Sequence, residues 1–297
     1  MSCKISVLRS LTLLSLVICS SAAQAIDLKW VGCGITRNAF MADLSAAYMA
    51  KYNHNITIEG GGATKGIRSV AAKQADIGGA CRYKLNTARE ETATRMVPVA
   101  WDALVAIVHN DNPVDSISLA NLRDLYLGKI TNWSQLGGES APLELLIRRG
   151  KISGVGRSLR NYLFDDLDLE FNSKHLYKSS GPLEKAVEKN INAISVTGVA
   201  SAYKRDFKIL KLEGLDPSFD NIKTGNYFLY RPLFLTYNRS AENGKQADHF
   251  IKFALGPEGR NIIRRNKVVP YFDGMLLIQN RLKEWNSFRN QALEQAN

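Results

Sequence analysis

The segment MVPVAWDALVAIVH at residues 96–109 decides how the rest of the chain can be arranged. It is apolar and rich in β-forming residues, so it predicts a long extended strand. A second extended segment, residues 227–237, follows a middle block that has strand and helix signals of its own. The block between these two extended segments is a complete α/β unit. The two segments therefore predict two α/β lobes joined at a hinge, with a ligand cleft between the lobes. A single continuous α/β domain is the alternative.

Strand-like and helix-like segments alternate on both sides of these crossings. The sequence predicts strands at 28–31, 55–59, 76–80 and 143–148, and helices at 39–52, 64–73, 180–190, 244–255, 257–266 and 276–296. Ser118 is a candidate N-cap for a further helix that runs to Tyr126. Such alternation is typical of βαβ units and a largely parallel sheet.

The first 25 residues have the layout of a secretory signal peptide. Lys4 and Arg9 precede the apolar stretch 11–19, and Ala23-Gln24-Ala25 is a small-x-small cleavage site. We therefore expect cleavage after Ala25 and a periplasmic protein. A short membrane anchor is the weaker alternative because the apolar stretch is too short. A lipoprotein modified at Cys19 is also weaker, since the residue before that cysteine is not small.

The composition is that of a globular protein with a sizeable core. The chain has 297 residues, of which 45% are apolar and 23% are charged. It carries 39 Lys and Arg against 28 Asp and Glu, a formal charge of +11. This excess favours anionic partners of any size without selecting among them. The basic residues are dispersed along the chain, so nucleic acid is not an expected partner.

Motifs for catalysis or for metal binding are not found in the sequence. There is no GxSxG, HExxH, GxxxxGK[ST] or CxxC motif, and the four histidines are scattered. The sequence therefore predicts no enzyme, no metal site and no cofactor. Cys33 and Cys81 would remain after export, each in a glycine-rich turn, and the residues alone leave open whether they form a disulfide.

Four glycine-rich turns lie between a predicted strand and a predicted helix. They occupy residues 32–36, 60–66, 78–82 and 148–154. Glycine lets the backbone approach a ligand closely, and the N–H groups at a helix start favour an anion. Each turn alone is weak support for a binding site, but four of them together with the positive charge indicate anion binding.

The stretch from Ala100 to Gly138, including LRDLYLGKITNW at residues 122–133, resembles the periplasmic phosphate-binding proteins of ABC importers. Residues 230–233 and 250–270 resemble the return crossing and the closing helices of that family. The resemblance implies an α/β, two-lobed periplasmic-binding-protein fold with two hinge crossover strands. Lobe 1 would comprise residues 26–108 plus 229–297, and lobe 2 residues 109–228. It also implies a monomer that delivers its ligand to a membrane ABC permease.

The resemblance carries the family's ligand contacts onto the glycine-rich turns. The implied ligand-binding residues are Thr36, Ala63, Thr64, Arg82, Asp102, Arg149, Ser153 and Gly154. Arg149 and Arg82 would grip an oxyanion as bidentate forks. Asp102 would accept the proton of a phosphate, or would alternatively be a hinge carboxylate paired with a basic neighbour. Ala63, Arg82 and Lys151 depart from the family's serine and acidic residues, which weakens the discrimination between phosphate and sulfate.

The matched positions place Cys33 and Cys81 on adjacent ligand turns, so the resemblance implies a disulfide between them. The function that it implies is an exported solute-binding protein that captures phosphate or a related tetrahedral oxyanion for an ABC importer. The alternative is a binding-fold protein with a degenerate pocket that acts as an envelope interaction or sensor protein.

Overall fold

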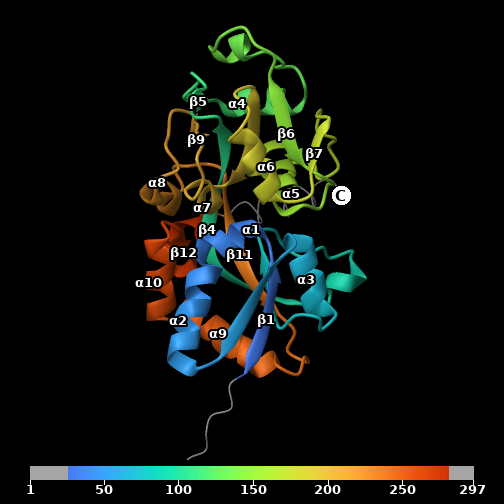
Figure 1. Ribbon diagram of the computed structural model, residues 1–297, viewed down its shortest axis with the longest axis vertical. Helices are drawn as coiled ribbons and strands as arrows, with labels where there is room; N and C mark the ends of the chain where they lie inside the picture. The colour runs from blue at the N-terminus through green and yellow to red at the C-terminus, as the bar shows by residue number, and fades with distance from the viewer. Residues whose placement is uncertain (1–25, 281–297) are drawn as a thin grey trace, which may run out of the picture.

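The computed structural model describes residues 26–280 of the chain (Figure 1). The strands of this part are β1 (Asp27–Gly32), β2 (Asn55–Gly60), β3 (Ile77–Ala80), β4 (Arg95–Val108), β5 (Ser116–Ile117), β6 (Glu144–Arg148), β7 (His175–Tyr177), β8 (Ala193–Gly198), β9 (Lys208–Ile209), β10 (Lys211–Leu212), β11 (Tyr230–Tyr237) and β12 (Val269–Pro270). The α-helices are α1 (Gly34–Thr36), α2 (Ala42–Tyr52), α3 (Ala63–Ala71), α4 (Leu119–Tyr126), α5 (Gly154–Leu159), α6 (Ser180–Val187), α7 (Val199–Ala202), α8 (Phe219–Thr224), α9 (Gly244–Leu255) and α10 (Pro257–Arg265). Two π-helical turns, η1 (Arg37–Met41) and η4 (Arg160–Phe164), continue α1 and α5.

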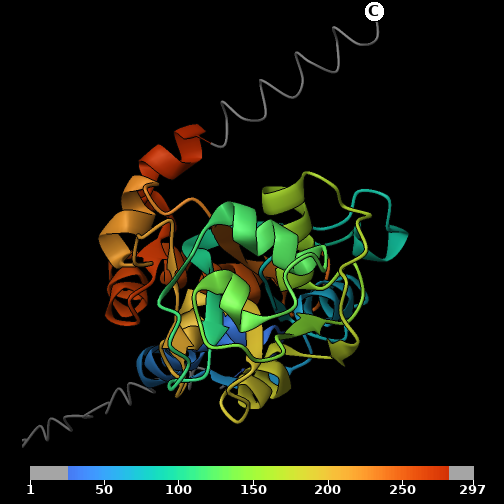
Figure 2. The same ribbon diagram turned by 90° about the horizontal axis from the view of Figure 1, so that it is seen from above.

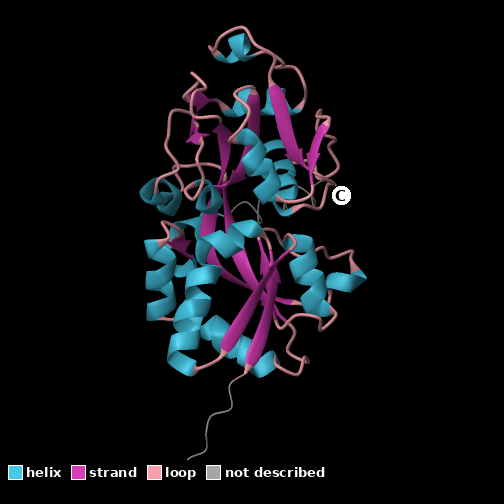
Figure 3. Cartoon of the chain, viewed as in Figure 1, coloured by secondary structure: helices cyan, strands magenta, loops and turns pink. Residues whose placement is uncertain are grey.

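One long sheet runs through both lobes, with helices on its sides (Figure 3). Its strand order is β2-β1-β3-β11-β4-β8-β6-β7, and β9 and β12 both pair with β4. The first-lobe strands β1, β2 and β3 are mutually parallel, as are the second-lobe strands β6, β7 and β8. Viewed along the long axis, helices surround these strands (Figure 2).

Strand β4 joins the lobes by changing its partner halfway along its length. Residues 95–103 pair with β11, and residues 104–108 pair with β8. Lobe 1 is the lower and lobe 2 the upper half of Figure 1, and β4 and β11 pass between them. The predicted two-lobed α/β fold with two crossover strands is confirmed. The predicted residue limits of the lobes stay a prediction. Within the sheet, β4 changes partner between residues 103 and 104.

Most predicted elements are confirmed, with small shifts at their ends. Helix α9 has the predicted bounds, and the hydroxyl of Ser118 accepts the Asn121 N–H (3.0 Å) at the start of α4. The sheet is less parallel than predicted, since β4 and β11 run antiparallel to their neighbours. A chain that enters lobe 2 on one central strand and returns on the next must produce this antiparallel pair. The predicted signal peptide, the alternative at Cys19 and most of helix 276–296 lie outside the described residues.

The core places the turns at the ends of β1 and β3 on one rigid support. Trp30 is fully buried, and a methyl group built on Gly32 or on Gly79 would overlap its indole ring. Both glycines are therefore needed where the two strands lie against this ring. The buried residues of both lobes form a continuous cluster through β4. None of the helices in residues 26–280 has the length and apolar character needed to cross a membrane.

Candidate anion-binding site between the lobes

The starts of three helices, α1, α3 and α5, meet where lobe 1 contacts lobe 2. The Gly61 and Gly62 N–H groups donate to Gly32 O (3.0 and 3.1 Å), which ties the start of α3 to the end of β1. A methyl group built on Gly154, the first residue of α5, would overlap the Cys81 sulfur and lie 3.3 Å from the Ala63 Cβ. Helix starts present backbone N–H groups that have no partner within the helix, and these favour an anion.

Thr36, a predicted ligand, lies in the first turn of the helical segment that follows β1. It is fully buried, and its hydroxyl donates to Cys33 O (3.0 Å). Its backbone N–H donates to the Cys33 sulfur (3.4 Å), and its Oγ1 lies 3.3 Å from the same sulfur. The donors that the resemblance assigns to an external anion therefore face the Cys33 thiol in this structure.

Ser153 and Gly154, also predicted ligands, form the start of α5 in lobe 2. Ser153 is the N-cap residue, yet its hydroxyl caps no backbone N–H. The Ser153 Oγ is buried and has no hydrogen-bond partner among the described residues. A buried hydroxyl without a partner costs free energy, so this group is available to a ligand at the interface between the lobes.

Arg82 is buried, and lobe 1 and the facing loop of lobe 2 already use its donors. It forms a bidentate ion pair with Glu91 (2.7 and 2.9 Å). Its remaining N–H groups donate to Tyr83 O (2.7 Å), Thr64 Oγ1 (3.0 Å) and Ile152 O (3.0 Å). All five guanidinium N–H groups are thus occupied. In contrast to the prediction, Arg82 therefore has no free pair of N–H groups with which to bind an anion in this arrangement.

The partners of Arg82 explain why it is held in place. Burial would raise the pKa of Glu91, but its hydrogen bonds from Arg82 and from the Leu85 N–H lower that pKa overall. The Thr64 hydroxyl, another predicted ligand, donates to Ile152 O (3.1 Å). Thr64 and Arg82 therefore bind the same lobe 2 carbonyl and act as a contact between the lobes.

Arg148, which the sequence reasoning did not select, has hydrogen-bonding capacity left at the site. Its guanidinium donates to Tyr177 O (3.3 Å), Ser180 Oγ (2.9 Å) and Lys178 O (2.7 Å). These bonds use three of its five N–H donors. A methyl group built on Gly62 would lie 3.9 Å from Arg148 Nη2, so the guanidinium faces the start of α3.

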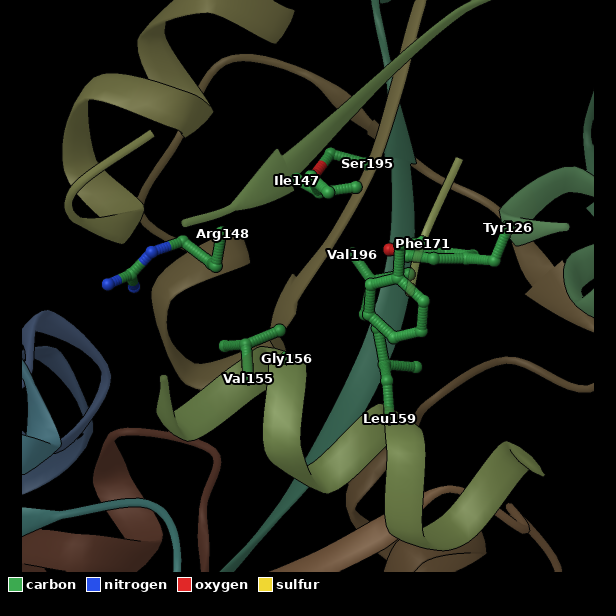
Figure 4. Close-up of a pocket in the computed structure, with 9 residues that line it drawn as sticks. All are labelled: Tyr126, Ile147, Arg148, Val155, Gly156, Leu159, Phe171, Ser195 and Val196. Atoms are coloured by element: carbon green, nitrogen blue, oxygen red, sulfur yellow. The ribbon is translucent and has the colours of Figure 1, made fainter. Parts of the chain in front are cut away.

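Figure 4 shows Arg148 among the residues that line a small cavity of lobe 2. A cavity of about 10 Å³ is lined by residues of α5, β6 and β8 and by the rings of Tyr126 and Phe171, and it has room for roughly one water molecule. Arg148 borders this cavity, but its side chain points away from the two rings (Figure 4). The predicted Arg149 is exposed, and its backbone N–H donates to Tyr177 O (2.9 Å). The structure therefore brings Arg148, one position earlier than predicted, to the site.

Asp102 is fully buried and paired with Arg231 of the returning strand. Its Oδ2 accepts from Arg231 Nη2 (3.0 Å) and Nε (3.2 Å), and its Oδ1 accepts from the Ala200 N–H (3.2 Å). Burial raises the pKa of Asp102, although the charge of Arg231 opposes this shift. Of the two interpretations made from the sequence, the hinge carboxylate with a basic partner matches this geometry.

Cys33 and Cys81 are both buried, and both are free thiols in the structure. The predicted disulfide is therefore not present in it, although the two side chains are adjacent and hydrogen-bond to each other. Burial would raise the pKa of Cys33, but hydrogen bonds from Cys81 and Thr36 and the charge of Arg231 lower it to about 6. The hydrogen bond to Cys33, together with burial, raises the pKa of Cys81. Near neutral pH the pair therefore carries one negative charge, on Cys33.

Within residues 26–280, no three His, Cys, Asp or Glu side chains are grouped so that they could hold a metal ion. The site consists of helix starts, hydroxyls, two thiols and arginines. This donor set suits an oxyanion bound by hydrogen bonds.

Comparison with known proteins identifies relatives of the same architecture. A family model described as "PBP superfamily domain" matches residues 31–258. The phosphate-binding protein PstS of Borreliella burgdorferi is 25% identical over 224 residues, covering 72% of this chain and 79% of the relative. The phosphate-binding protein PstS of Bacillus subtilis is 27% identical over 176 residues, covering 58% of this chain and 57% of the relative.

Solved structures show the same likeness. A Clostridium perfringens protein described as a "Phosphate ABC Transporter Substrate-Binding Protein with Bound Phosphate" superposes with a TM-score of 0.72 and 28% identity. That match covers 82% of this chain and 99% of the other. An ABC-type phosphate transport receptor from Vibrio cholerae, at 24% identity and a TM-score of 0.61, supports the fold. These relatives are solute-binding proteins and not enzymes. The chain belongs to the PBP superfamily domain family and is PstS-like in sequence, with the two-lobed fold of periplasmic binding proteins.

Proposed function

We propose that this chain is an exported, periplasmic solute-binding protein that captures phosphate or a related tetrahedral oxyanion between its lobes and passes it to a membrane ABC permease. Its relatives are named for phosphate binding, and its first 25 residues have the pattern of a signal peptide. We propose that it works as a monomer, since two lobes of one chain supply the whole site.

The observation that carries this proposal is a pair of unused donors, the Ser153 hydroxyl at the start of α5 and the guanidinium of Arg148 at the end of β6. Among residues 26–280, the Ser153 hydroxyl is buried without a partner, and Arg148 retains two unused N–H groups, with its Nη2 close to Gly62 of lobe 1. A tetrahedral oxyanion accepts several hydrogen bonds at once and would satisfy both groups together with the N–H groups of the helix starts. Thr36 would complete the set from lobe 1.

Selectivity between phosphate and sulfate should be modest. A protonated phosphate needs an acceptor, which sulfate does not. Asp102, the predicted acceptor, is occupied by Arg231 and by the Ala200 N–H. We therefore expect binding of phosphate, arsenate and sulfate with affinities that differ by less than about tenfold.

Calorimetric titration tests this proposal, with protein that has been stripped of ligand by unfolding and refolding. Phosphate, arsenate, sulfate and chloride are compared at equal ionic strength, under both oxidising and reducing conditions. Saturable one-to-one binding of the tetrahedral anions, without binding of chloride, supports the function. If none of the tetrahedral anions binds under either condition, the function is rejected.

One set of observations favours the second candidate, a protein with a degenerate pocket that acts in envelope interaction or sensing. The donors of Arg82 are all occupied, and Thr36 faces the Cys33 thiol in place of an open cleft. The same titration separates the candidates, because a degenerate pocket binds no oxyanion in either redox state.

A further inference from the structure

Cys33 and Cys81 are held side by side by the sheet and not by chance contact of two loops. Gly32 of β1 lies opposite Gly79 of the parallel strand β3, and each cysteine comes directly after its strand. The Cys33 N–H donates to Gly79 O (3.1 Å), which extends the pairing beyond the strand. The two thiols hydrogen-bond at this end of the sheet.

The Cys33 sulfur occupies the donors that an external oxyanion would need. The N–H of Thr36 donates to it, and the Thr36 hydroxyl lies within hydrogen-bond distance (3.3 Å). The nearby charge of Arg231 stabilises the thiolate, and the negative charge of Cys33 also acts on Arg148. The reduced protein therefore holds an anion of its own at the meeting point of the helix starts.

We propose that Cys33 and Cys81 are a redox-active pair that sets the anion affinity of the site. Reduced, the pair fills the Thr36 donors with its own thiolate; oxidised, it forms a neutral disulfide and leaves those donors to an oxyanion. This inference rests on the proposed function for the identity of the ligand. The pairing of the two cysteines does not depend on it.

The oxidant that this chemistry requires is a low-molecular-weight disulfide. The Cys33 thiolate attacks one sulfur of that disulfide, forms a mixed disulfide and expels the first small thiolate. Cys81 then loses its proton and attacks the Cys33 sulfur, which expels the second small thiolate. The protein pair loses two electrons, and the small disulfide gains them.

The lobes control access to the pair. Both cysteines are buried, and Gly154 of lobe 2 lies directly against the Cys81 sulfur. Exchange therefore requires the lobes to separate, and a bound oxyanion that keeps them closed should slow the exchange. Oxidation removes a negative charge beside Arg148 and Arg231, so the disulfide form should bind an oxyanion at least about tenfold more tightly near neutral pH.

The test uses the exported, purified protein equilibrated in glutathione buffers of graded potential. Peptide mapping locates the disulfide, and calorimetry with phosphate and with sulfate gives the affinity of the fully oxidised and fully reduced forms. We expect a Cys33–Cys81 disulfide and tighter binding in the oxidised form. Cys33→Ser, which has neither thiolate nor disulfide, should bind equally well in both buffers.

Failure to form the Cys33–Cys81 disulfide at any potential overturns the inference, and so does equal affinity of the two forms. Loss of oxyanion binding in both forms and in Cys33→Ser is a different result, because it rejects the proposed function. The disulfide map then still decides whether the two cysteines are a redox pair.

Discussion

Arg231 of β11 lies directly opposite Asp102 of β4 in the sheet register, and the two side chains form a fully buried ion pair (3.0 Å). The same guanidinium reaches Cys81 O (3.3 Å) in lobe 1 and Gly154 O (3.4 Å) in lobe 2. One ion pair thus connects both crossover strands with the turns on either side of the candidate site. Its position at the hinge links the stability of the fold to the geometry of the site.

Asp102→Asn should destabilise the protein strongly, because it leaves the charge of Arg231 buried without its partner. Breaking one side of a buried ion pair costs about 3–5 kcal/mol. Urea unfolding of the variant measures the free energy of unfolding directly. Lys252→Ala is the control, since Lys252 is 73% exposed and its pair with Asp248 should contribute less than about 1 kcal/mol. Equal effects of the two substitutions would contradict the role of the hinge pair.

Arg148→Ala should reduce oxyanion affinity at least about 100-fold, because the charge-assisted hydrogen bonds of this guanidinium would be lost. Arg149→Ala, at the adjacent and exposed position, should change the affinity less than about threefold. Calorimetric titration with phosphate and sulfate measures both variants. A larger loss of affinity in Arg149→Ala than in Arg148→Ala would show that Arg149, the residue predicted from the sequence, binds the anion.

The structure places Arg148 at the site, and not Arg149 as predicted from the sequence. This difference shows a limit of prediction from sequence. Adjacent residues at the end of a strand point in opposite directions, so a shift by one position changes which side chain reaches the cleft. A motif match alone cannot resolve such a shift. The burial of β6 and its pairing with β7 decide it, since they direct Arg148 toward Ser180 and the start of α3.

The fold was more predictable than the site because it depends on long, repeated signals. The apolar run at 96–109 and the glycine-rich turns mark β4 and the helix starts without knowledge of tertiary contacts. The partner of Arg82 could not be found in this way, since Glu91 becomes its neighbour only after the loop between them has folded back. The occupation of the Thr36 donors by Cys33 likewise depends on the path of the turn.

Gly154→Ala should keep the lobes apart, because its methyl group would overlap the Cys81 sulfur. Overpacking of a buried contact costs about 1–3 kcal/mol, and opening of the lobes relieves it. We expect a larger radius of gyration in small-angle X-ray scattering and a loss of oxyanion affinity of about tenfold or more.

Two further variants make the test of Gly154 specific. Gly60→Ala is the matched control, since a methyl group there meets no atom of residues 26–280 within 4 Å. Cys81→Ala removes the overlapping sulfur, so it should restore closure when combined with Gly154→Ala. A Gly154→Ala protein that remains closed and binds normally would show that this contact does not limit closure.

The reduced protein should titrate with the Cys33 thiolate forming near pH 6, where an ordinary thiol has its pKa at 9.0. The groups that face Cys33 are Cys81, Thr36 and Arg231, and each of them favours the thiolate.

Since the unfolded thiol stays protonated up to its ordinary pKa, the stability relative to Cys33→Ser should rise between about pH 6 and pH 9 and be lost as the pH falls through 6. Each pKa unit of the shift is worth about 1.4 kcal/mol, which moves the unfolding midpoint by a few degrees. The ultraviolet absorbance of the thiolate and thermal unfolding measure both effects, and Cys81→Ala should raise the pKa of Cys33 because it removes the thiol donor. Thiolate formation only near the ordinary pKa would show that the helix starts do not stabilise a charge at Cys33.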